Sequence, residues 1–493
     1  ISPTFTTDGS FNSISIGKGA NSVAGNTVLG EGALDAAVSG INNTAVGKNA
    51  LTDHTSGERN AAFGSNSLAN NTTGNYNTSI GDSTLFDNTT GSNNTALGRA
   101  ALANNTTANN NVAVGYQALV DNTTGTQNVS VGVNALALNT TGASNVAVGA
   151  YALDANTTAN YNTAVGTSTL TSNTTGTLNT ALGQSALFSN TTASNNTGIG
   201  YNALNANTTG PDNVAVGANA LDANTTGRMN VGIGKDALGS NTEGELNVGI
   251  GREALLNNTT GDSNVGIGRN ALSNNTTANN NVAVGDSALN ANTTGTGNTA
   301  VGTNALDAAT TANNNTAVGI HSLGTNTTGY NNVGCGAYSL RYNTEGFENV
   351  AVGYSALEAN TTGDFNIGIG RSALKTQTTA NHNIAIGYQA GEDITTGQQN
   401  TAVGSQALKD GTTAAQNVAI GAFSLDALLN GAFNVAVGNQ ALGAATSSNQ
   451  NTAVGYRAML STTTGAENVS VGGDALSTNT TGSSNVSVGQ GSL

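Results

Sequence analysis

An internal 17-residue repeat constrains this chain more than any other feature of its sequence. Gly30, Gly47 and Gly64 begin a series of glycines that continues without insertion or deletion to Gly489. Gly489 lies 459 positions after Gly30, which makes 27 periods and therefore 28 copies of the unit. So short and regular a repeat is typical of a solenoid, in which each copy stacks on the next.

The copy that begins at Asn111 shows the pattern, and we number its residues from this Asn as position 1. Asn at position 1 and Gly at position 5 occur in all 28 copies, and Leu at position 9 occurs in 26. The other two copies have Gly391 and Met459 at position 9. A 17-residue unit with Gly at two places cannot hold a useful helix, and its apolar spacing is not that of a helix.

Local patterns within the unit predict one strand and two turns. Val112, Ala113 and Val114 alternate large and small, as expected for a strand with one face inward. Gly115 suits a tight corner. Leu119 is expected to provide a second apolar contact within the core, and a turn-forming stretch begins near Asn122. The expected core and side-chain ladders comprise Asn111, Val112, Val114, Gly115, Leu119 and Asn122.

The predicted fold is therefore all-β: a parallel β-solenoid of 28 stacked coils, with identical Asn residues forming ladders from coil to coil. At ~4.8 Å per coil the stack would be roughly 130 Å long. We expect an N-terminal cap with a short first coil over residues 1–29 and a continuous solenoid over residues 30–493. Charged residues make up only 8% of the chain and aromatic residues 4%, too few large side chains for a thick globular core.

The association state follows from a comparison of two energies. Each coil would bury two β-branched residues and one Leu, about 1.5–3 kcal/mol apiece, whereas ordering its backbone costs about 1–2 kcal/mol per residue. Apolar burial alone therefore does not offset the entropy lost on ordering the backbone. Close packing against identical chains would add stabilisation, and a small residue at position 3 would allow that packing, as in Ala113, Ser130, Ala147 and Gly249. We therefore expect a parallel homotrimer. The alternative is a monomeric solenoid whose small residues fit a narrow cross-section.

The strand motif of Asn145–Gly149 and of Asn383–Gly387 resembles the head repeats of trimeric autotransporter adhesins. The longer unit is similar to repeats of bacterial and phage proteins of the tail-fibre type. The resemblance covers the chain from about Ser13 to Leu493. It implies a trimeric, left-handed parallel β-roll on a bacterial surface or a virion, with a role in adhesion or host attachment. The 17-residue period departs from the shorter coils of adhesin heads.

Charge and composition favour no catalytic or cofactor chemistry. A net charge of −15 with 13 Lys and Arg is unsuited to nucleic acid. No apolar run is long enough to cross a bilayer, so we expect no membrane insertion in this segment. Cys335 is the only cysteine, and His54, His321 and His382 lie far apart along the repeat. We expect solvent-facing histidines, no catalytic or metal site, no cofactor and no enzyme activity.

Two outer rows suggest binding instead. Five tyrosines directly follow the recurrent Gly and are candidates for contact with a cell-surface glycan or protein receptor: Tyr116, Tyr201, Tyr354, Tyr388 and Tyr456. They would otherwise only shield a corner of the coil. The Thr pair at positions 13 and 14 resembles an ice-binding row, although adjacent residues cannot share one face. The leading hypothesis is the structural shaft of an extracellular or virion-borne adhesive fibre, acting as a rigid spacer.

Overall fold

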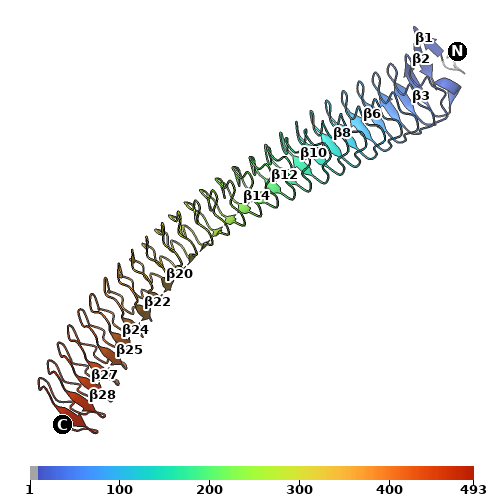
Figure 1. The fold of residues 1–493 in the computed structure, drawn as a ribbon. Helices are drawn as coiled ribbons and strands as arrows, with labels where there is room; N and C mark the ends of the chain where they lie inside the picture. The colour runs from blue at the N-terminus through green and yellow to red at the C-terminus, as the bar shows by residue number, and fades with distance from the viewer. Residues whose placement is uncertain (1–8) are drawn as a thin grey trace. The chain divides into compact units, whose positions relative to one another are not determined.

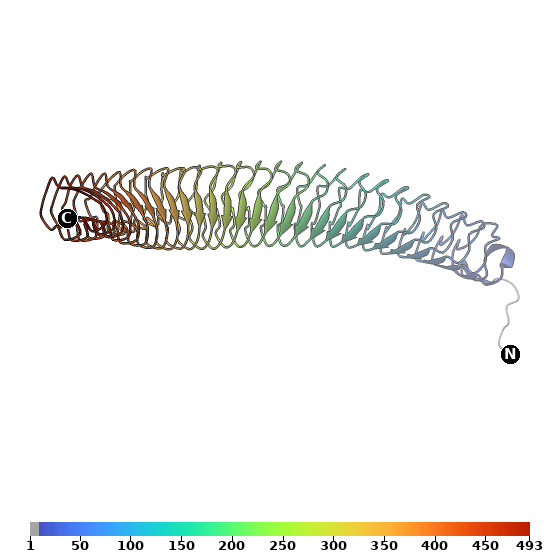
Figure 2. The same cartoon turned by 90° about the horizontal axis from the view of Figure 1, so that it is seen from below.

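The computed structural model describes residues 9–493 and contains no α-helix in that range. It divides into two compact units, Ile1–Glu245 and Leu246–Leu493. Each unit is a stack of coils, and each coil contributes one short strand to a parallel sheet (Figures 1 and 2). The first eight residues of the expected cap lie outside the described range. Continuity of the stack between residues 245 and 246 stays a prediction.

The first unit carries β1 to β15 and one short 3₁₀ segment, η1 (Ala20–Ser22). The strands are β1 (Gly9–Phe11), β2 (Ile14–Gly17), β3 (Thr27–Gly30), β4 (Thr44–Val46), β5 (Ala61–Phe63), β6 (Thr78–Ile80), β7 (Thr95–Leu97), β8 (Val112–Val114), β9 (Val129–Val131), β10 (Val146–Val148), β11 (Thr163–Val165), β12 (Thr180–Leu182), β13 (Thr197–Ile199), β14 (Val214–Val216) and β15 (Val231–Ile233).

The second unit carries β16 to β30, again with one strand per coil. The strands are β16 (Val248–Ile250), β17 (Val265–Ile267), β18 (Val282–Val284), β19 (Thr299–Val301), β20 (Thr316–Val318), β21 (Val333–Cys335), β22 (Val350–Val352), β23 (Ile367–Ile369), β24 (Ile384–Ile386), β25 (Thr401–Val403), β26 (Val418–Ile420), β27 (Val435–Val437), β28 (Thr452–Val454), β29 (Val469–Val471) and β30 (Val486–Val488).

Strand register follows the repeat. Val112 of β8 pairs with Val129 of β9, its counterpart one repeat later, and the same parallel register joins consecutive strands from β3 to β15 and from β16 to β30. Each position therefore lies over its counterpart in the neighbouring coil. The prediction of an all-β parallel β-solenoid with 17-residue coils is confirmed.

The N-terminal end departs from this pattern. β2 runs antiparallel to β3, with Ile16 opposite Leu29, and β1 runs antiparallel to β2. The sequence predicts a short first coil here, but the segment from Gly17 to Gly30 reverses the chain instead. The antiparallel pair therefore covers the outer edge of β3, the first strand of the parallel stack, which would otherwise expose unpaired backbone groups.

The interior of the coil is narrow and lined by small side chains. Ala113, Ala118 and Leu119 are fully buried. Val112 and Val114, which the alternation placed in the core, lie on the outside and are only partly covered. The expectation was wrong about the direction of the strand: the small residue points inward and the two large residues point outward.

This reversal also removes one argument for the trimer. The small residues at position 3, such as Ala113, Ser130 and Ala147, face the interior of their own coil and are fully buried. They cannot admit a second chain, so their size fits the narrow cross-section of a single solenoid. Any association between copies must use the residues at positions 2 and 4 or other outer positions.

Close approach of the coils accounts for the glycine at position 5. Gly115 has a φ of 137°, and a Cβ built on it would overlap the backbone carbonyl of Gly132 in the next coil. Only glycine avoids this overlap. Leu119 is also left-handed, with a φ of 55°, a conformation unfavourable for Leu. Its burial and the hydrogen bond from its backbone N–H to the carbonyl of Ala135, 2.9 Å, offset that strain.

The asparagine at position 1 forms one hydrogen bond within its own coil and one to the next coil. The Nδ2 of Asn111 donates to the carbonyl of Gly125 in the same coil, 3.0 Å away. The Oδ1 of Asn111 accepts from the backbone N–H of Asn128 in the next coil, 2.9 Å away. The side chain is fully buried, so both contacts are shielded from water. Asn111 is confirmed as a ladder residue.

A second ladder runs through position 12. The Nδ2 of Asn122 donates to the Oδ1 of Asn105, 3.0 Å away, and also to the carbonyl of Gly125, 2.9 Å away. In the second unit this ladder is interrupted after Asn292, because position 12 of the next coil is Ala309, and it resumes at Asn326, whose Oδ1 accepts from Asn343. The Oδ1 of Asn292 is buried and has no hydrogen-bond partner.

Replacing Leu221 with Asp tests the core assignment. Leu221 is fully buried, so a carboxylate there would be an unpaired buried charge, and we expect a loss of roughly 3–5 kcal/mol with opening of the adjacent coils. Hydrogen exchange over residues 196–246 measures it. The matched control is Leu178→Asp, because Leu178 is 55% exposed. Equal protection in both variants would mean that Leu221 is not part of the core.

Replacing Ala309 with Asn should restore the interrupted ladder. The new amide would donate to the unpartnered Oδ1 of Asn292, and we expect a gain of about 1 kcal/mol, typical of a satisfied buried acceptor. Thermal unfolding of the variant measures it. Ala308→Asn, at the partly exposed neighbouring position, is the control and should leave the melting temperature unchanged. A lower melting temperature for Ala309→Asn would contradict the ladder assignment.

Candidate interaction surfaces

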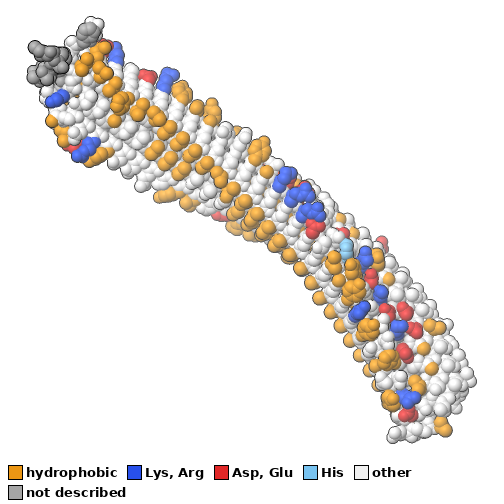
Figure 3. All heavy atoms as spheres, turned by 180° about the vertical axis from the view of Figure 1, so that it is seen from behind, with side chains coloured by type: hydrophobic (Ala, Val, Ile, Leu, Met, Phe, Trp, Pro, Cys, Tyr) orange, Lys and Arg blue, Asp and Glu red, His pale blue; other side chains and the backbone are white. Residues whose placement is uncertain are grey.

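An apolar row runs along the outside of the sheet at position 4. In all 28 coils this residue is Val, Ile, Leu, Phe or Cys. Many of these side chains are nonetheless exposed, for example Ile369 at 37% and Leu182 at 47%, and Cys335 is exposed as well. Figure 3 shows hydrophobic side chains recurring at equivalent places in successive coils. We call this set of residues the outer apolar row.

Other outer positions carry no such restriction. Position 6 includes Glu31, Lys48, Ser65 and Tyr116, and position 14 includes Thr, Ser and Glu345. Apolar residues thus persist at position 4 although their side chains are not needed in the interior. Exposed apolar surface of this extent is typical of an interaction site. Sequence reasoning missed the row because it placed these residues in the core.

The five predicted tyrosines are exposed, as expected. Their exposed fractions run from 42% for Tyr116 to 53% for Tyr201 and Tyr456, with Tyr354 and Tyr388 between these values. An arginine guanidinium lies over three of the rings, 5.8 Å from the Tyr116 centroid for Arg99. Tyr354 and Tyr456 are covered in the same way by Arg371 and Arg457. These three tyrosines therefore have one ring face engaged within the chain.

A line of contacting rings lies at positions 16 and 17 of the second unit, and it was not foreseen from the sequence. The rings of Tyr330 and Phe347 stack with centroids 4.8 Å apart, and those of Phe365 and His382 stack at 5.0 Å. Phe347 and Phe365 meet edge to face at 5.3 Å. The ring residue is at position 16 up to Phe347 and at position 17 from Phe365. The line of rings therefore does not appear as one recurring position of the repeat.

Thr at positions 13 and 14 divides into two different environments. The Oγ of Thr123 donates to the backbone carbonyl of Thr140 in the next coil, 3.0 Å away, and is partly buried. Thr124 is exposed. One threonine of each pair therefore helps to hold the coils together, and the other forms a single exposed row.

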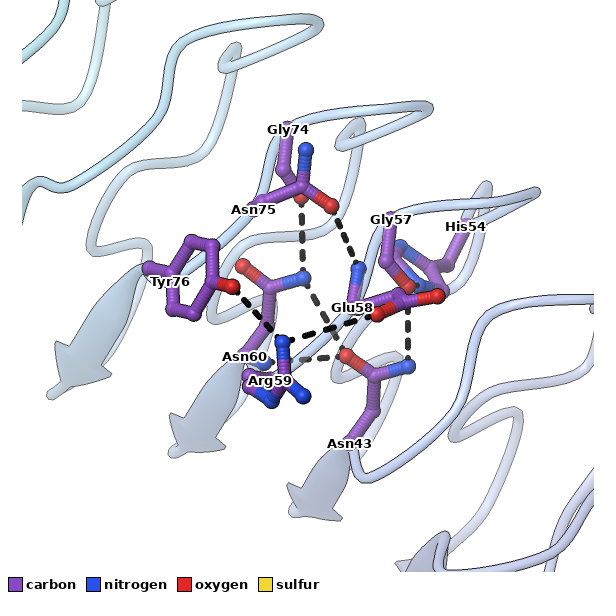
Figure 4. Close-up of polar contacts among 9 residues, drawn as sticks. All are labelled: Asn43, His54, Gly57, Glu58, Arg59, Asn60, Gly74, Asn75 and Tyr76. Carbon is purple, nitrogen blue, oxygen red and sulfur yellow. Dashed lines mark hydrogen bonds and ion pairs between the residues drawn. The ribbon is translucent and has the colours of Figure 1, made fainter.

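His54 lies inside the coil, although a solvent-facing histidine was expected there. It occupies position 12 and is fully buried. Its Nε2 donates to the carbonyl of Gly57, 2.8 Å away, and its Nδ1 accepts from the Nδ2 of Asn71, 3.1 Å away. The imidazole therefore makes the two contacts that Asn makes in other coils. Figure 4 shows His54 beside Gly57, whose carbonyl also accepts from Asn43.

Burial lowers the pKa of His54 below its usual value of 6.5, although hydrogen bonds oppose the shift. The neutral ring fits the ladder because Nδ1 must be an acceptor for Asn71. Protonation would place two donors against each other. His321, in contrast, is half-buried and stacks on Tyr338 at 5.9 Å, and His382 is exposed.

Aspartates recur at position 10, where burial raises the pKa of Asp154, Asp222, Asp307 and Asp426. The pKa of Asp426 rises to about 6, chiefly through burial and further through the nearby charge of Asp410. Asp426 lines a hollow of about 360 Å³ with Phe423, Gln440, Gly443, Ala444, Leu460 and Ser461. These lining residues include one carboxyl and no His or Cys, which is too few ligands for a metal cage.

Within residues 9–493, no group of three or more His, Cys, Asp or Glu residues is placed to hold a metal ion. The same range contains no helix long and apolar enough to cross a membrane. No protein-family model matches the chain, and no curated protein matches it. The surfaces described above are therefore interpreted from their own chemistry.

The buried His54 should make the N-terminal coils sensitive to acid. Since its folded pKa lies below 6.5, the unfolded chain binds the proton more readily, and stability should fall as pH drops below about 6.5. The loss is at most about 1.4 kcal/mol per pH unit. Hydrogen exchange over residues 43–76 at pH 7.5 and pH 5 measures it.

His54→Asn is the informative variant, since it keeps the ladder and removes the titrating group. We expect its protection at pH 5 to match that at pH 7.5. His382→Asn, at an exposed position, should leave the acid sensitivity of the wild type in place. The assignment fails if His54→Asn opens at pH 5 as readily as the wild-type chain.

Proposed function

We propose that this chain is the structural shaft of an extracellular or virion-borne adhesive fibre. The shaft would act as a rigid spacer, and its outer residues would add contacts to host or cell-surface receptors. The proposal combines the regular solenoid with the resemblance of the repeat to adhesin heads and tail fibres. A stack in which every coil repeats the same contacts is lengthened by adding coils, which suits a spacer.

The outer apolar row is the observation that carries the proposal. An apolar side chain at position 4 of every coil is unexplained in a chain that stays alone in water, because the interior is filled by positions 3, 8 and 9. Burying such a row against identical rows would remove it from water along the stack. The homotrimer expected from the sequence is therefore proposed again, now through positions 2 and 4 rather than position 3.

Receptor contact by the exposed tyrosines is a second part of the proposal. Tyr201 and Tyr388 are exposed at 53% and 47%. An aromatic ring with an exposed face and a hydroxyl group can stack on a sugar or protein surface and hydrogen-bond at its tip. The exposed tyrosines would therefore decorate a shaft whose mechanical role does not depend on them.

Light scattering and electron microscopy of the chain test the proposal. We expect a mass of three chains and an elongated particle. The double variant Val352→Glu and Ile369→Glu places two charges on the outer apolar row, at 37% exposed positions. Each buried unpaired charge costs roughly 3 kcal/mol or more, so association should weaken at least a hundredfold while the strand signal in circular dichroism remains.

The matched control places the same charges on another face. Thr328→Glu and Thr362→Glu lie at exposed position 14, where Glu345 occurs naturally. This control should keep the mass of the wild type. A wild-type chain that stays monomeric at high concentration would remove the proposed fibre shaft in its trimeric form.

A further inference from the structure

Four consecutive strands of the second unit are bracketed by aromatic or cationic side chains. We call positions 16 and 17, just before each strand, the leading flank, and positions 6 and 7, just after it, the trailing flank. The leading flanks of β21 to β24 carry, in order, Tyr330, Phe347, Phe365 and His382. The trailing flanks of the same strands carry Tyr338, Tyr354, Arg371 and Tyr388.

Both flanks are organised within the chain. On the leading flank, contacts at 4.8, 5.3 and 5.0 Å link the four rings in one line. On the trailing flank, Tyr338 meets Tyr354 edge to face at 5.7 Å, and Arg371 lies 5.9 Å from the centroid of Tyr354. The two aligned groups border the same stretch of the outer apolar row, from Cys335 to Ile386.

The orientation of the rings favours a protein partner over a saccharide. A sugar packs against the face of an aromatic ring, but Tyr330 faces Phe347 at an interplanar angle of 3° and Phe365 faces His382 at 4°. The faces within these pairs are covered by each other. The ring edges that stacking leaves uncovered suit edge-to-face contacts with other aromatic side chains.

Rotational symmetry explains why such groups occur on both flanks at one level. When parallel copies are related by an axis along the stack, the leading flank of one copy faces the trailing flank of its neighbour. Two aromatic groups on the same strands then meet only if the copies are in register. Charges agree with this pairing, because Glu348 is exposed on the leading flank and Arg371 on the trailing flank.

A repetitive apolar row cannot fix its own register. Sliding one copy by a single coil, ~4.8 Å, replaces each apolar contact by an equivalent one and loses only the contacts of one coil at the ends. We infer that the two flanks of β21 to β24 form a lock between copies of this chain, which sets their register. The inference rests on the proposed association through the outer apolar row and names the element that aligns it.

Spin labels at a single introduced cysteine test the lock. All chains carry Thr362→Cys in a Cys335→Val background, because Cys335 belongs to the outer apolar row and a label there would occupy the proposed interface. Thr362 is exposed at position 14, between β22 and β23, so every copy carries one label at the same level. In-register copies give one narrow distance between labels, and slipped copies add longer distances. The test variant replaces Tyr330, Phe347, Tyr354 and Phe365 with Ser. The control variant is Tyr201→Ser with Tyr456→Ser, since these trailing-flank tyrosines have no ring on the leading flank of their strands.

We expect the wild type and the control to associate with one narrow distance. The test variant should keep the same mass in light scattering, because its outer apolar row is intact, but its distances should broaden toward longer values. If the test variant still associates and keeps one narrow distance between labels, the lock is wrong, but the fibre proposal is unaffected. A monomeric wild-type chain is a different outcome, which removes the proposed association itself and the lock with it.

Discussion

The amide of the position 1 asparagine is the contact on which the rest of the structure depends. Through Nδ2, Asn111 closes its own coil onto Gly125, and through Oδ1 it holds the backbone N–H of Asn128 in the next coil. One buried side chain thus sets both the circumference of a coil and its spacing from the next. An insertion of one residue would displace the amide from the coil beneath it and leave buried polar groups unsatisfied. This explains why the 17-residue period runs from Asn26 to Asn485 without a break.

So tight a coil determines which side chains can be inside. The interior admits Ala113, Ala118 and Leu119, and the coils approach so closely that Gly115 cannot carry a Cβ. The bulky residues at positions 2 and 4 must therefore point outward. The apolar outer face is a consequence of the narrow interior, and it leaves the chain with hydrophobic surface that a single solenoid cannot bury. The proposed association follows from this imbalance rather than from any special motif.

Much of the fold could be predicted because a repeat shows in the sequence which residues are equivalent. Asn111, Leu119 and Asn122 were placed in the ladders and core from recurrence alone, and they are buried. The direction of Val112 and Val114 could not be obtained in this way, because an alternation has the same period whichever face points inward. The informative signal was the size of position 3, which is Ala, Gly or Ser in 27 of 28 coils. The prediction that His54 faces solvent failed for a related reason. Only the geometry shows that an imidazole can make the hydrogen bonds of the position 12 asparagine. Of the candidate site, the exposed tyrosines were foreseen, but the line from Tyr330 to His382 changes position within the repeat.

Irregularities inside and outside the coil behave differently, and the difference bears on what the surface does. Inside, the loss of the core Leu in one coil is compensated within that coil. Gly391 replaces the core Leu at position 9, and Ile394, at position 12 of that coil, reaches within 2.9 Å of where a Cβ of residue 391 would lie. Outside, the rings before β21 to β24 are coordinated across four coils, although neighbouring coils do not need them to stack. Compensation within one coil preserves a single chain, whereas coordination across coils and on both flanks is expected of a surface that meets another surface of equal length. The aromatic residues on the leading and trailing flanks of β21 to β24 are therefore better understood as a property of an assembly than of the isolated solenoid.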